Sequence, residues 1–502
     1  MIAGVAVITL ATTLVFATGL RMSFWDDEAA TASEATRSPS ELWHLLAHSE
    51  GGLAGYVLAV RAWAVFAGTS EAALRLPSLV AFAIVVAGTG WLTWRISGAY
   101  AAVIAAGVIA LHPTLGPVYS IEARPYAVST ALVVLAAVTA HRASRGAGRR
   151  PYVVWSLLAA AAIACHVFAA LALAPQVVWL LPERRGGRTR AFLVAVAVPA
   201  AVTLTTAALA ARATVLQSWI DPLNVSSSLR IGRAVLATGA LVAIAASVPG
   251  LCLWRWRSGS RPIRHERVAD PVDLVVLLAW ATLPLCALAA FSLIGTPTVV
   301  PRYALSSAVP VAALVGLAIS RAAAGIKAPG RAGTAIVAAI VLVVGIAGGG
   351  IAYKRAGALR PLDKPTDLHA AATWVLDHQA EGDGILYAPT WTEMGMRWYL
   401  VDATARTAPV DVTARASTSA ASAGSLFTPN VDVTVARARL ATLTRVWIAG
   451  YGNTTPWQPV HEVGIPLAVL VERCWTLQDR EFFGVSIELW ARPSTRRAAD
   501  CP

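Results

Sequence analysis

Long apolar stretches that recur along the chain restrict its fold more than any other feature of the sequence. The first stretch, residues 2–20, carries no charged side chain, and as a helix it can cross roughly 30 Å of hydrocarbon. Comparable stretches follow at short intervals, and they predict about eleven membrane-spanning helices. The predicted spans are residues 2–20, 76–94, 100–118, 125–140, 152–165, 167–181, 191–211, 234–254, 272–294, 304–319 and 332–353.

The charge content agrees with a polytopic membrane protein. Charged residues make up 14% of the 502 residues and hydrophobic residues 57%, whereas a soluble domain has about 25% charged residues. In a soluble protein the net charge of +13 would indicate a nucleic-acid partner. Here the Lys and Arg residues gather in short loops between apolar stretches, so we interpret them as a topology signal and expect no nucleic acid.

The basic loops predict one orientation in the plasma membrane. Loops 142–150, 184–190, 255–267 and 321–331 are all rich in Arg. With a cytoplasmic N-terminus, every one of these loops lies on the cytoplasmic side, as the positive-inside rule requires. The first loop, residues 21–75, and the C-terminal tail then lie outside the cytoplasm.

The first outer loop contains a short apolar segment of its own. Residues 56–66 are apolar but interrupted by Arg61, and Trp63 suits the level of the lipid headgroups. We predict an amphipathic helix in the plane of the membrane. A crossing at this point would turn all the basic loops outward, against the charge rule.

The C-terminal tail has the composition of a water-soluble domain. Charged residues return after residue 353, and no later stretch is long enough to span a membrane. The local patterns predict a helix at 368–378, strands at 384–388, 445–449 and 485–490, and a loop at 416–424. We therefore predict a helical membrane domain of residues 1–355 and an external α/β domain of residues 356–502. Cys474 and Cys501 can pair in an oxidising compartment, although nothing in the sequence requires it.

Three carboxylates follow the first apolar stretch directly, in the sequence Phe-Trp-Asp26-Asp27-Glu28. Like charges so close together raise one another's pKa, which suits a proton acceptor or a cation site at the membrane face. The alternative is an ordinary solvated helix end, because acidic residues often follow a membrane span. Oxygen ligands in one short run are weak evidence for a metal, so the sequence predicts no certain cofactor and leaves a divalent cation such as Mg²⁺ or Mn²⁺ open at the acidic cluster.

Other polar residues at the ends of apolar stretches fall on the same predicted side. They are Glu50, Glu122, Arg124, Tyr126, His166, Arg302 and Tyr303. Arg binds phosphate through two parallel hydrogen bonds and keeps its charge, so this set suits a site for a phosphorylated lipid. The alternatives are headgroup contacts for the two arginines and simple helix packing for His166.

These motifs resemble those of a known superfamily. Asp27-Glu28 after the first span is similar to the Asp-Glu pair of the GT-C membrane glycosyltransferases, which include protein O-mannosyltransferases and lipid A aminoarabinose transferases. The resemblance continues in GTSEAALRLPS (68–78, with Arg75), EARPY (122–126), CHVF (165–168) and PRYA (301–304). Together the motifs cover most of the membrane part, up to about residue 321. The pattern is most similar to an actinobacterial branch that modifies cell-envelope glycans or proteins.

The resemblance implies an inverting transfer of a sugar from a polyprenyl-phosphate donor to an acceptor outside the cytoplasm. Asp27 would act as the general base, with Glu28 or Asp26 orienting it or binding the acceptor. The resemblance further assigns donor-phosphate binding to Arg124, Tyr126, Arg302 and Tyr303, and supporting roles to Glu122, His166 and Arg75. Mannose is the first expectation for the sugar and arabinofuranose the second; the acceptor is a lipoglycan, a wall polysaccharide or a secreted protein.

In one place the sequence departs from that branch, which has an Asp followed by a His before the in-plane helix. Here Glu50 stands near the Asp position and no His follows it, so its part as a second acid is in question. The chief rival function is a transporter or flippase for a lipid-linked sugar. A transporter would be expected to carry charges in mid-span or two matching halves, and this sequence has almost none of the former and no visible repeat.

Overall fold

The computed structural model describes residues 1–146, 148–181, 189–212, 220, 269–295, 297–325, 366–388, 391–402, 408–415, 418–451 and 475–493. The predicted spans at 234–254 and 332–353 and the Cys474–Cys501 pair lie outside these residues. The chain divides into two compact units. The helical unit comprises Met1–Leu20, Glu50–Ala59 and Arg75–Gly357, and the sheet unit comprises Arg21–Ser49, Val60–Leu74 and Ala358–Pro502.

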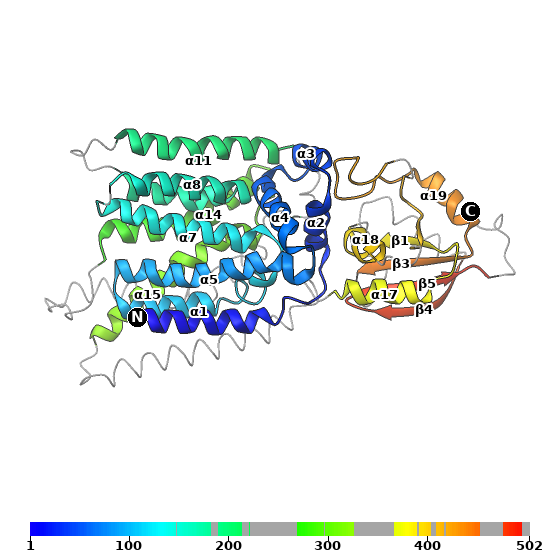
Figure 1. The fold of residues 1–502 in the computed structure, drawn as a ribbon, viewed down its shortest axis with the longest axis horizontal. Helices are drawn as coiled ribbons and strands as arrows, with labels where there is room; N and C mark the ends of the chain where they lie inside the picture. Colours follow the sequence, from blue (N-terminus) through cyan, green and yellow to red (C-terminus); the bar gives the residue numbers. More distant parts are fainter. Residues whose placement is uncertain are drawn as a thin grey trace. The chain divides into compact units, whose positions relative to one another are not determined.

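The described helical unit consists of apolar helices joined by short turns, and in Figure 1 its long helices run side by side. Its helices are α1 (Ile2–Ala17), α5 (Glu71–Ile96, whose first turn belongs to the sheet unit), α6 (Ala99–Ala110), α7 (Pro125–Ser144), α8 (Arg150–Cys165), α9 (Ala169–Leu173), α10 (Val177–Leu180), α11 (Thr189–Ala210), α14 (Pro271–Leu293) and α15 (Ala308–Gly325). Short 3-10 turns lie at Gly51–Leu53, Tyr119–Ile121, Ala174–Gln176 and Pro301–Ser307. Within the described residues, five helical segments are long and apolar enough to cross a membrane, namely Glu71–Ile96, Pro125–Ser144, Thr189–Ala210, Pro271–Leu293 and Pro301–Arg321.

Every predicted span that falls on described residues coincides with a helix or a run of short helices, but several helices are shorter than predicted. The clearest case is the predicted span 100–118, because α6 ends at Ala110. Pro113 disfavours helical backbone at the residue before it, and the His112 Nδ1 atom accepts hydrogen bonds from the backbone of Leu115 at 3.2 Å and Thr114 at 3.4 Å. The chain therefore turns where hydropathy alone predicted a continued helix.

Small residues allow the helices of this unit to approach closely. A side chain at Gly316 on α15 would lie only 2.4 Å from the carbonyl oxygen of Ala101 on α6. Ala101, Ala105 and Ala106 on α6 are fully buried. Close backbone contact between small residues is the usual way in which membrane helices associate, because lipid gives apolar side chains little reason to leave it.

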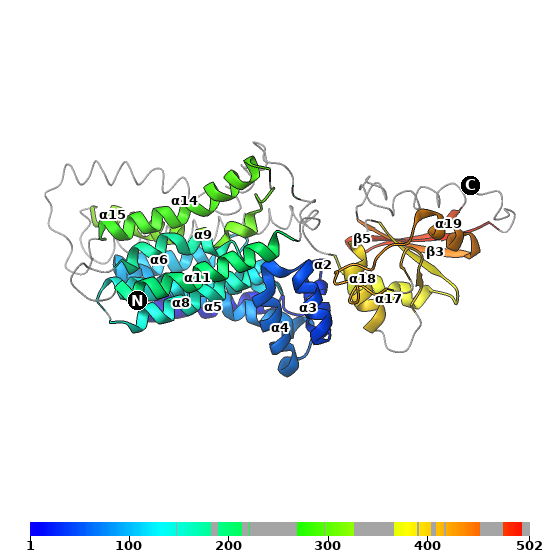
Figure 2. The same ribbon diagram turned by 90° about the horizontal axis from the view of Figure 1, so that it is seen from above.

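The sheet unit contains a five-stranded mixed sheet in the order β2-β1-β3-β5-β4. The strands are β1 (Gly384–Ala388), β2 (Val410–Asp411), β3 (Arg445–Tyr451), β4 (Thr476–Phe482) and β5 (Val485–Ala491). β1 is parallel to β2 and β3, whereas β5 is antiparallel to β3 and β4. Helices α17 (Leu368–His378) and α18 (Thr392–Asp402) cover one face and α19 (Val433–Thr442) the other (Figure 2).

The predicted helix at 368–378 and the predicted strand at 384–388 are confirmed to the residue. The other two predicted strands are confirmed as parts of β3 and β5, and residues 418–424 form turns as expected. β2, β4, α18 and α19 were not predicted. β4 could not be predicted because all seven of its residues are exposed. It therefore lacks the alternation of apolar and polar side chains that marks a half-buried strand.

Parts of the loop at residues 21–75 belong to the sheet unit. The loop contains α2 (Asp26–Thr36), α3 (Pro39–His48) and α4 (Ala54–Ala67), and α4 coincides with the predicted amphipathic helix. The guanidinium of Arg37 donates to the backbone carbonyl of Ser425 at 2.6 Å, and the Ser49 hydroxyl donates to that of Gly424 at 3.0 Å. Arg61, which interrupts the apolar pattern of α4, donates to the backbone carbonyl of Arg37. The loop and the C-terminal sheet therefore pack together although they are more than 350 residues apart in sequence.

Candidate active site

The three predicted carboxylates form the first turn of α2, where the partial positive charge of the helix N-terminus favours acidic side chains. Glu28 has a capping role, because its Oε2 atom accepts from the backbone N–H of Trp25 at 3.4 Å. Asp26 and Glu28 are buried, whereas Asp27 is half-buried. Asp27 is thus the member of the cluster with a side chain that a ligand can reach within the sheet unit.

The segment that leads into α2 is anchored by α18. The backbone N–H of Phe24 donates to the Tyr399 hydroxyl at 2.7 Å, and that hydroxyl donates to Glu71 Oε1 at 2.9 Å. Burial raises the pKa of Tyr399, so its hydroxyl keeps the proton that it donates. The Phe24 ring is completely buried, 6.3 Å from the Trp398 ring and 6.4 Å from the Tyr399 ring.

A glycine on α18 allows this close approach. A side chain at Gly395 would lie 2.6 Å from Asp26 Oδ1, so α18 and the start of α2 are in backbone-to-side-chain contact. In the same region the backbone N–H of His369 donates to the Ser23 hydroxyl at 3.1 Å. Tyr399 and Gly395 were not predicted as site residues, since nothing in the local pattern of the tail links them to the acidic cluster.

In the helical unit, four of the predicted residues form one aromatic and cationic group. The guanidinium carbon of Arg302 lies 5.6 Å from the centre of the Tyr126 ring. The His166 ring lies between two tyrosines, with its centre 5.5 Å from that of Tyr126 and 5.2 Å from that of Tyr303. Phe168, which was not assigned a role, stacks on Tyr303 at 4.9 Å. The CHVF and PRYA motifs therefore meet in space.

His166 is a neutral member of this group. It lies in the turn between α8 and α9, and it is buried. Burial, together with the positive charges of Arg302 and Arg124, lowers the pKa of His166 to about 3. The cationic character of the group comes from the two arginines, and we call these five residues (Arg124, Tyr126, His166, Arg302 and Tyr303) the arginine–tyrosine cluster.

Local backbone structure positions both arginines. Arg124 has extended backbone at the N-cap of α7, followed by Pro125, which suits the first position of a helix. Its N–H donates to the carbonyl of Glu122 at 2.8 Å, and the buried Ser78 hydroxyl donates to the same carbonyl at 2.6 Å. Arg302 is the second residue of the 3-10 turn at Pro301–Ser307. The cluster thus lies beside a helix N-terminus, a place where proteins bind anions.

The remaining predicted residues have distinct surroundings. Glu122 is buried in the loop that precedes Arg124. Arg75 is also buried and donates to the backbone carbonyls of Leu20 at 3.2 Å and Gly19 at 3.4 Å, where the chain leaves α1. Glu50 is largely buried at the start of the 3-10 turn Gly51–Leu53. Of the predicted acids it alone shares the helical unit with Glu122; Asp26, Asp27 and Glu28 belong to the sheet unit.

The structure contains no ready-made metal centre in its described part. Among those residues no group of three His, Cys, Asp or Glu side chains is arranged to hold a metal ion. In the acidic cluster the carboxylate of Glu28 serves as a helix cap. A divalent cation at this cluster stays a prediction from the sequence.

Comparison with solved structures identifies proteins of similar fold. No protein-family model matches the sequence, and no curated protein matches it. The structure of ArnT from Cupriavidus metallidurans bound to undecaprenyl phosphate matches with a TM-score of 0.58 and 13% identity, covering 98% of each chain. The apo form of the same protein gives 0.58 and 12% over the same shares. The archaeal oligosaccharyltransferase AglB from Archaeoglobus fulgidus, solved with an inhibitory peptide and a dolichol-phosphate, gives 0.43 and 13%, covering 88% of this chain and 69% of the other.

The likeness to ArnT extends over nearly the whole chain, including both the helices and the C-terminal sheet. The chain therefore has the same overall fold as ArnT.

Proposed function

We propose that this chain is a membrane glycosyltransferase that moves a sugar from a polyprenyl-phosphate donor to an acceptor of the cell envelope outside the cytoplasm. The observation that carries the proposal is the arginine–tyrosine cluster, where two guanidinium groups and two tyrosines surround a neutral imidazole beside the N-terminus of α7. Such a group suits a phosphate attached to an apolar chain. The ArnT structure of the same fold is bound to undecaprenyl phosphate.

The proposed reaction is a single displacement with inversion. Asp27 accepts the proton of the acceptor hydroxyl while that oxygen forms a bond to the anomeric carbon of the sugar. The bond from the anomeric carbon to the donor phosphate breaks, and the polyprenyl phosphate leaves with the electron pair. Arg124 and Arg302 neutralise the charge that develops on the leaving phosphate, with Tyr126 and Tyr303 beside them. Mannose is the first expected sugar and arabinofuranose the second.

The test of the base is Asp27→Asn in purified protein in detergent, with a panel of radiolabelled polyprenyl-phosphate sugars. Because Asn cannot accept the proton, kcat should fall by about 10²–10⁴-fold with little change in the KM for the donor. Asp479→Asn, on the exposed strand β4, is the matched control and should retain full activity. Full turnover by the Asp27 variant would remove this residue from the mechanism.

The test of the phosphate site is Arg302→Ala in the same assay. Loss of a charge-assisted contact costs about 1.5–3 kcal/mol, which corresponds to a rise of roughly 10–150-fold in the KM for the donor. Arg190→Ala, at the exposed start of α11, serves as the control. The assay also separates an enzyme from a transporter, because detergent leaves no membrane to cross. A protein that binds the lipid-linked sugar but never transfers it in detergent would fit the transporter instead.

A further inference from the structure

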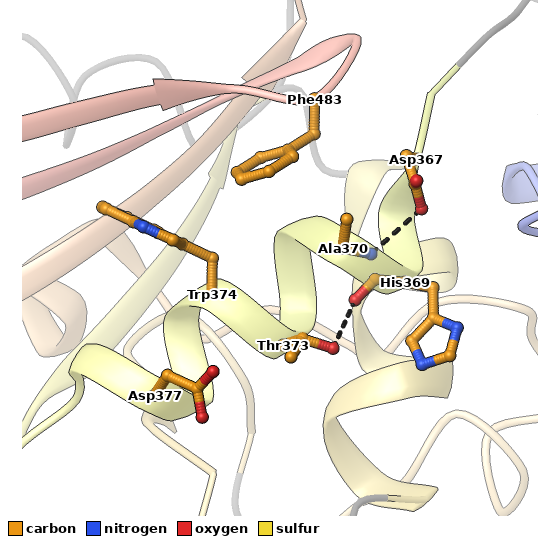
Figure 3. A pocket seen from close by; sticks show the side chains of 7 residues that line it. All are labelled: Asp367, His369, Ala370, Thr373, Trp374, Asp377 and Phe483. Atoms are coloured by element: carbon orange, nitrogen blue, oxygen red, sulfur yellow. Dashed lines mark hydrogen bonds between the residues drawn. The ribbon is translucent and has the colours of Figure 1, made fainter.

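A groove in the sheet unit has no part in the proposed displacement. Its volume is about 400 Å³, which lies within the range of ligand sites in proteins, about 300–1,000 Å³. It lies between α17 and the turn that joins β4 to β5 (Figure 3). The side chains that line it are Asp367, His369, Thr373, Trp374, Asp377 and Phe483.

Two aromatic rings form the apolar wall of the groove. Trp374 is half-buried, and the centre of its ring lies 6.4 Å from that of Phe483 at an interplanar angle of 49°. Trp374 is fixed by packing edge to face on the fully buried Trp447, with the ring centres 5.4 Å apart. The Trp447 indole N–H donates in turn to Asp383 Oδ2 at 2.8 Å.

The turn that carries Phe483 is fixed as well. Gly484 has a φ of +78°, a backbone conformation that side chains disfavour. The backbone N–H of Asp367 donates to the carbonyl of Phe483 at 2.7 Å, so the turn is tied to the start of α17. Both aromatic rings are therefore in place before any ligand binds, which lowers the entropic cost of binding.

Carboxylates stand at both ends of this wall. Asp367 caps α17, with its Oδ1 atom accepting from the backbone N–H of Ala370 at 3.0 Å. A carboxylate has about four acceptor positions, so Asp367 retains capacity for a ligand hydroxyl. Asp377 is exposed ten residues further along the same helix, which corresponds to about 15 Å. The exposed Thr373 hydroxyl lies between them and donates to the carbonyl of His369 at 2.8 Å, so its oxygen can still accept.

We propose that this groove binds a short stretch of an acceptor glycan. The inference deepens the proposed transferase function and rests on it for the identity of the acceptor class. A sugar ring has an apolar C–H face that packs on aromatic rings and a rim of hydroxyls that donate to carboxylates. A chain of sugars uses the aromatic wall and both separated carboxylates at once. A single ammonium ion would occupy only the surroundings of one carboxylate.

The test is binding to the full-length protein in detergent by isothermal titration calorimetry, without any donor lipid. The probes are linear α-mannan and arabinan oligosaccharides, with spermidine as the cationic alternative. The main variant is Phe483→Ala, because removal of Trp374 would also disturb the buried Trp447. Its matched control is Phe482→Ala, the adjacent residue on the same hairpin, which is 49% exposed and does not line the groove.

We expect an oligosaccharide to bind the unaltered protein and the Phe482 variant equally. Phe483→Ala should weaken that binding by about tenfold, which corresponds to the loss of about 1.4 kcal/mol from one aromatic contact. An unchanged melting temperature in the Phe483 variant shows that the domain is folded. Absence of oligosaccharide binding, equal binding in both variants, or binding of spermidine alone would overturn the proposal.

A second readout separates this proposal from the transferase function. In the transfer assay, Phe483→Ala should raise the KM for a long oligosaccharide acceptor and leave that for a monosaccharide glycoside unchanged. Oligosaccharide binding through the groove without any sugar transfer would contradict the transferase and support the groove. Normal transfer with equal acceptor KM values in both variants would contradict the groove alone.

Discussion

Asp273, near the start of α14, shows how single polar residues hold the helical unit together. Its carboxylate is buried, and the Trp179 indole N–H donates to Oδ1 at 2.9 Å while Arg145 donates to Oδ2 at 3.0 Å. The His141 ring lies 3.6 Å from the same carboxylate. These partners lie on α10 (Trp179) and at the end of α7 (His141 and Arg145), so the acid joins both helices to α14. Buried carboxylates of this kind are stable only while their partners remain.

Asp273→Ala leaves the N–H of Trp179 without its acceptor in a buried place, and the expected loss of stability is about 1–3 kcal/mol. The Arg145 contact adds less to this figure, because its side chain is 46% exposed and solvent screens the pair. Thermal unfolding in detergent measures the change.

The control for this prediction is Asp270→Ala. Asp270 is an exposed acid that caps α14 through the N–H of Val272 at 3.0 Å, and loss of such a cap costs about 1 kcal/mol. The Asp273 variant should therefore be less stable than the Asp270 variant. Equal melting temperatures would show that the buried network contributes little.

At the scale of elements, the contact between α18 and the start of α2 connects the C-terminal domain to the proposed chemistry. Phe24 is buried against α18, and Tyr399 accepts from its backbone N–H. Asp27 follows three residues later on the same segment. Helix α18 of the C-terminal domain therefore holds the segment that leads to the proposed general base.

We expect Tyr399→Phe to lower kcat and to leave the KM for the donor nearly unchanged. The variant removes one hydroxyl that accepts from Phe24 N–H and donates to Glu71, so the segment before α2 and the first residue of α5 each lose one hydrogen bond, while the aromatic packing stays. Each typical hydrogen bond contributes about 0.5–1.5 kcal/mol. Steady-state kinetics with the labelled donor separate the two parameters.

The matched control is Tyr100→Phe, because Tyr100 on α6 is 52% exposed. It should behave as the unaltered protein. A stronger version of the test is Gly395→Ala, since its added carbon would meet Leu368 at 2.2 Å and Asp26 at 2.6 Å. An active Gly395 variant with unchanged kcat would argue against a positioning role for α18.

For the whole molecule, the basic loops and the proposed function require the same topology. If the chain uses polyprenyl-phosphate sugars outside the cytoplasm, the acidic cluster, the arginine–tyrosine cluster and the C-terminal domain must all lie on the outer side of the membrane. The loop around Arg145 and Arg149 must then be cytoplasmic.

Cysteine labelling in cells tests this topology. In a variant without the native cysteines, Ser422→Cys in the C-terminal domain should react with a membrane-impermeant maleimide in intact spheroplasts. Ser144→Cys, at the end of α7, should react only after the membrane is permeabilised. Both positions are exposed, so access to the reagent depends on the side of the membrane. The reverse pattern would exclude the proposed function.

The helices and some strands of this protein were predictable because their signals are local. A run of apolar residues or an alternating pattern is set by neighbours in sequence, and α17 and β1 were found to the residue for this reason. The end of α6 and the exposed strand β4 could not be predicted in this way. The His112 ring, which accepts hydrogen bonds in the turn after α6, does not change the hydrophobic pattern. Strand β4 has no buried face, so its sequence shows no alternation of apolar and polar residues.

The sequence by itself determined the membrane class of the chain, the types of residue at its site and the presence of a C-terminal α/β domain. Only the tertiary structure decided which of these residues meet. It joined CHVF to PRYA around a neutral His166, gave Glu28 a capping role, and attached the acidic helix α2 to Tyr399, 375 residues after Phe24. The physical reason is that hydropathy acts over a few neighbouring residues, whereas hydrogen bonds and ring contacts form between whatever side chains the packed helices bring within a few ångströms.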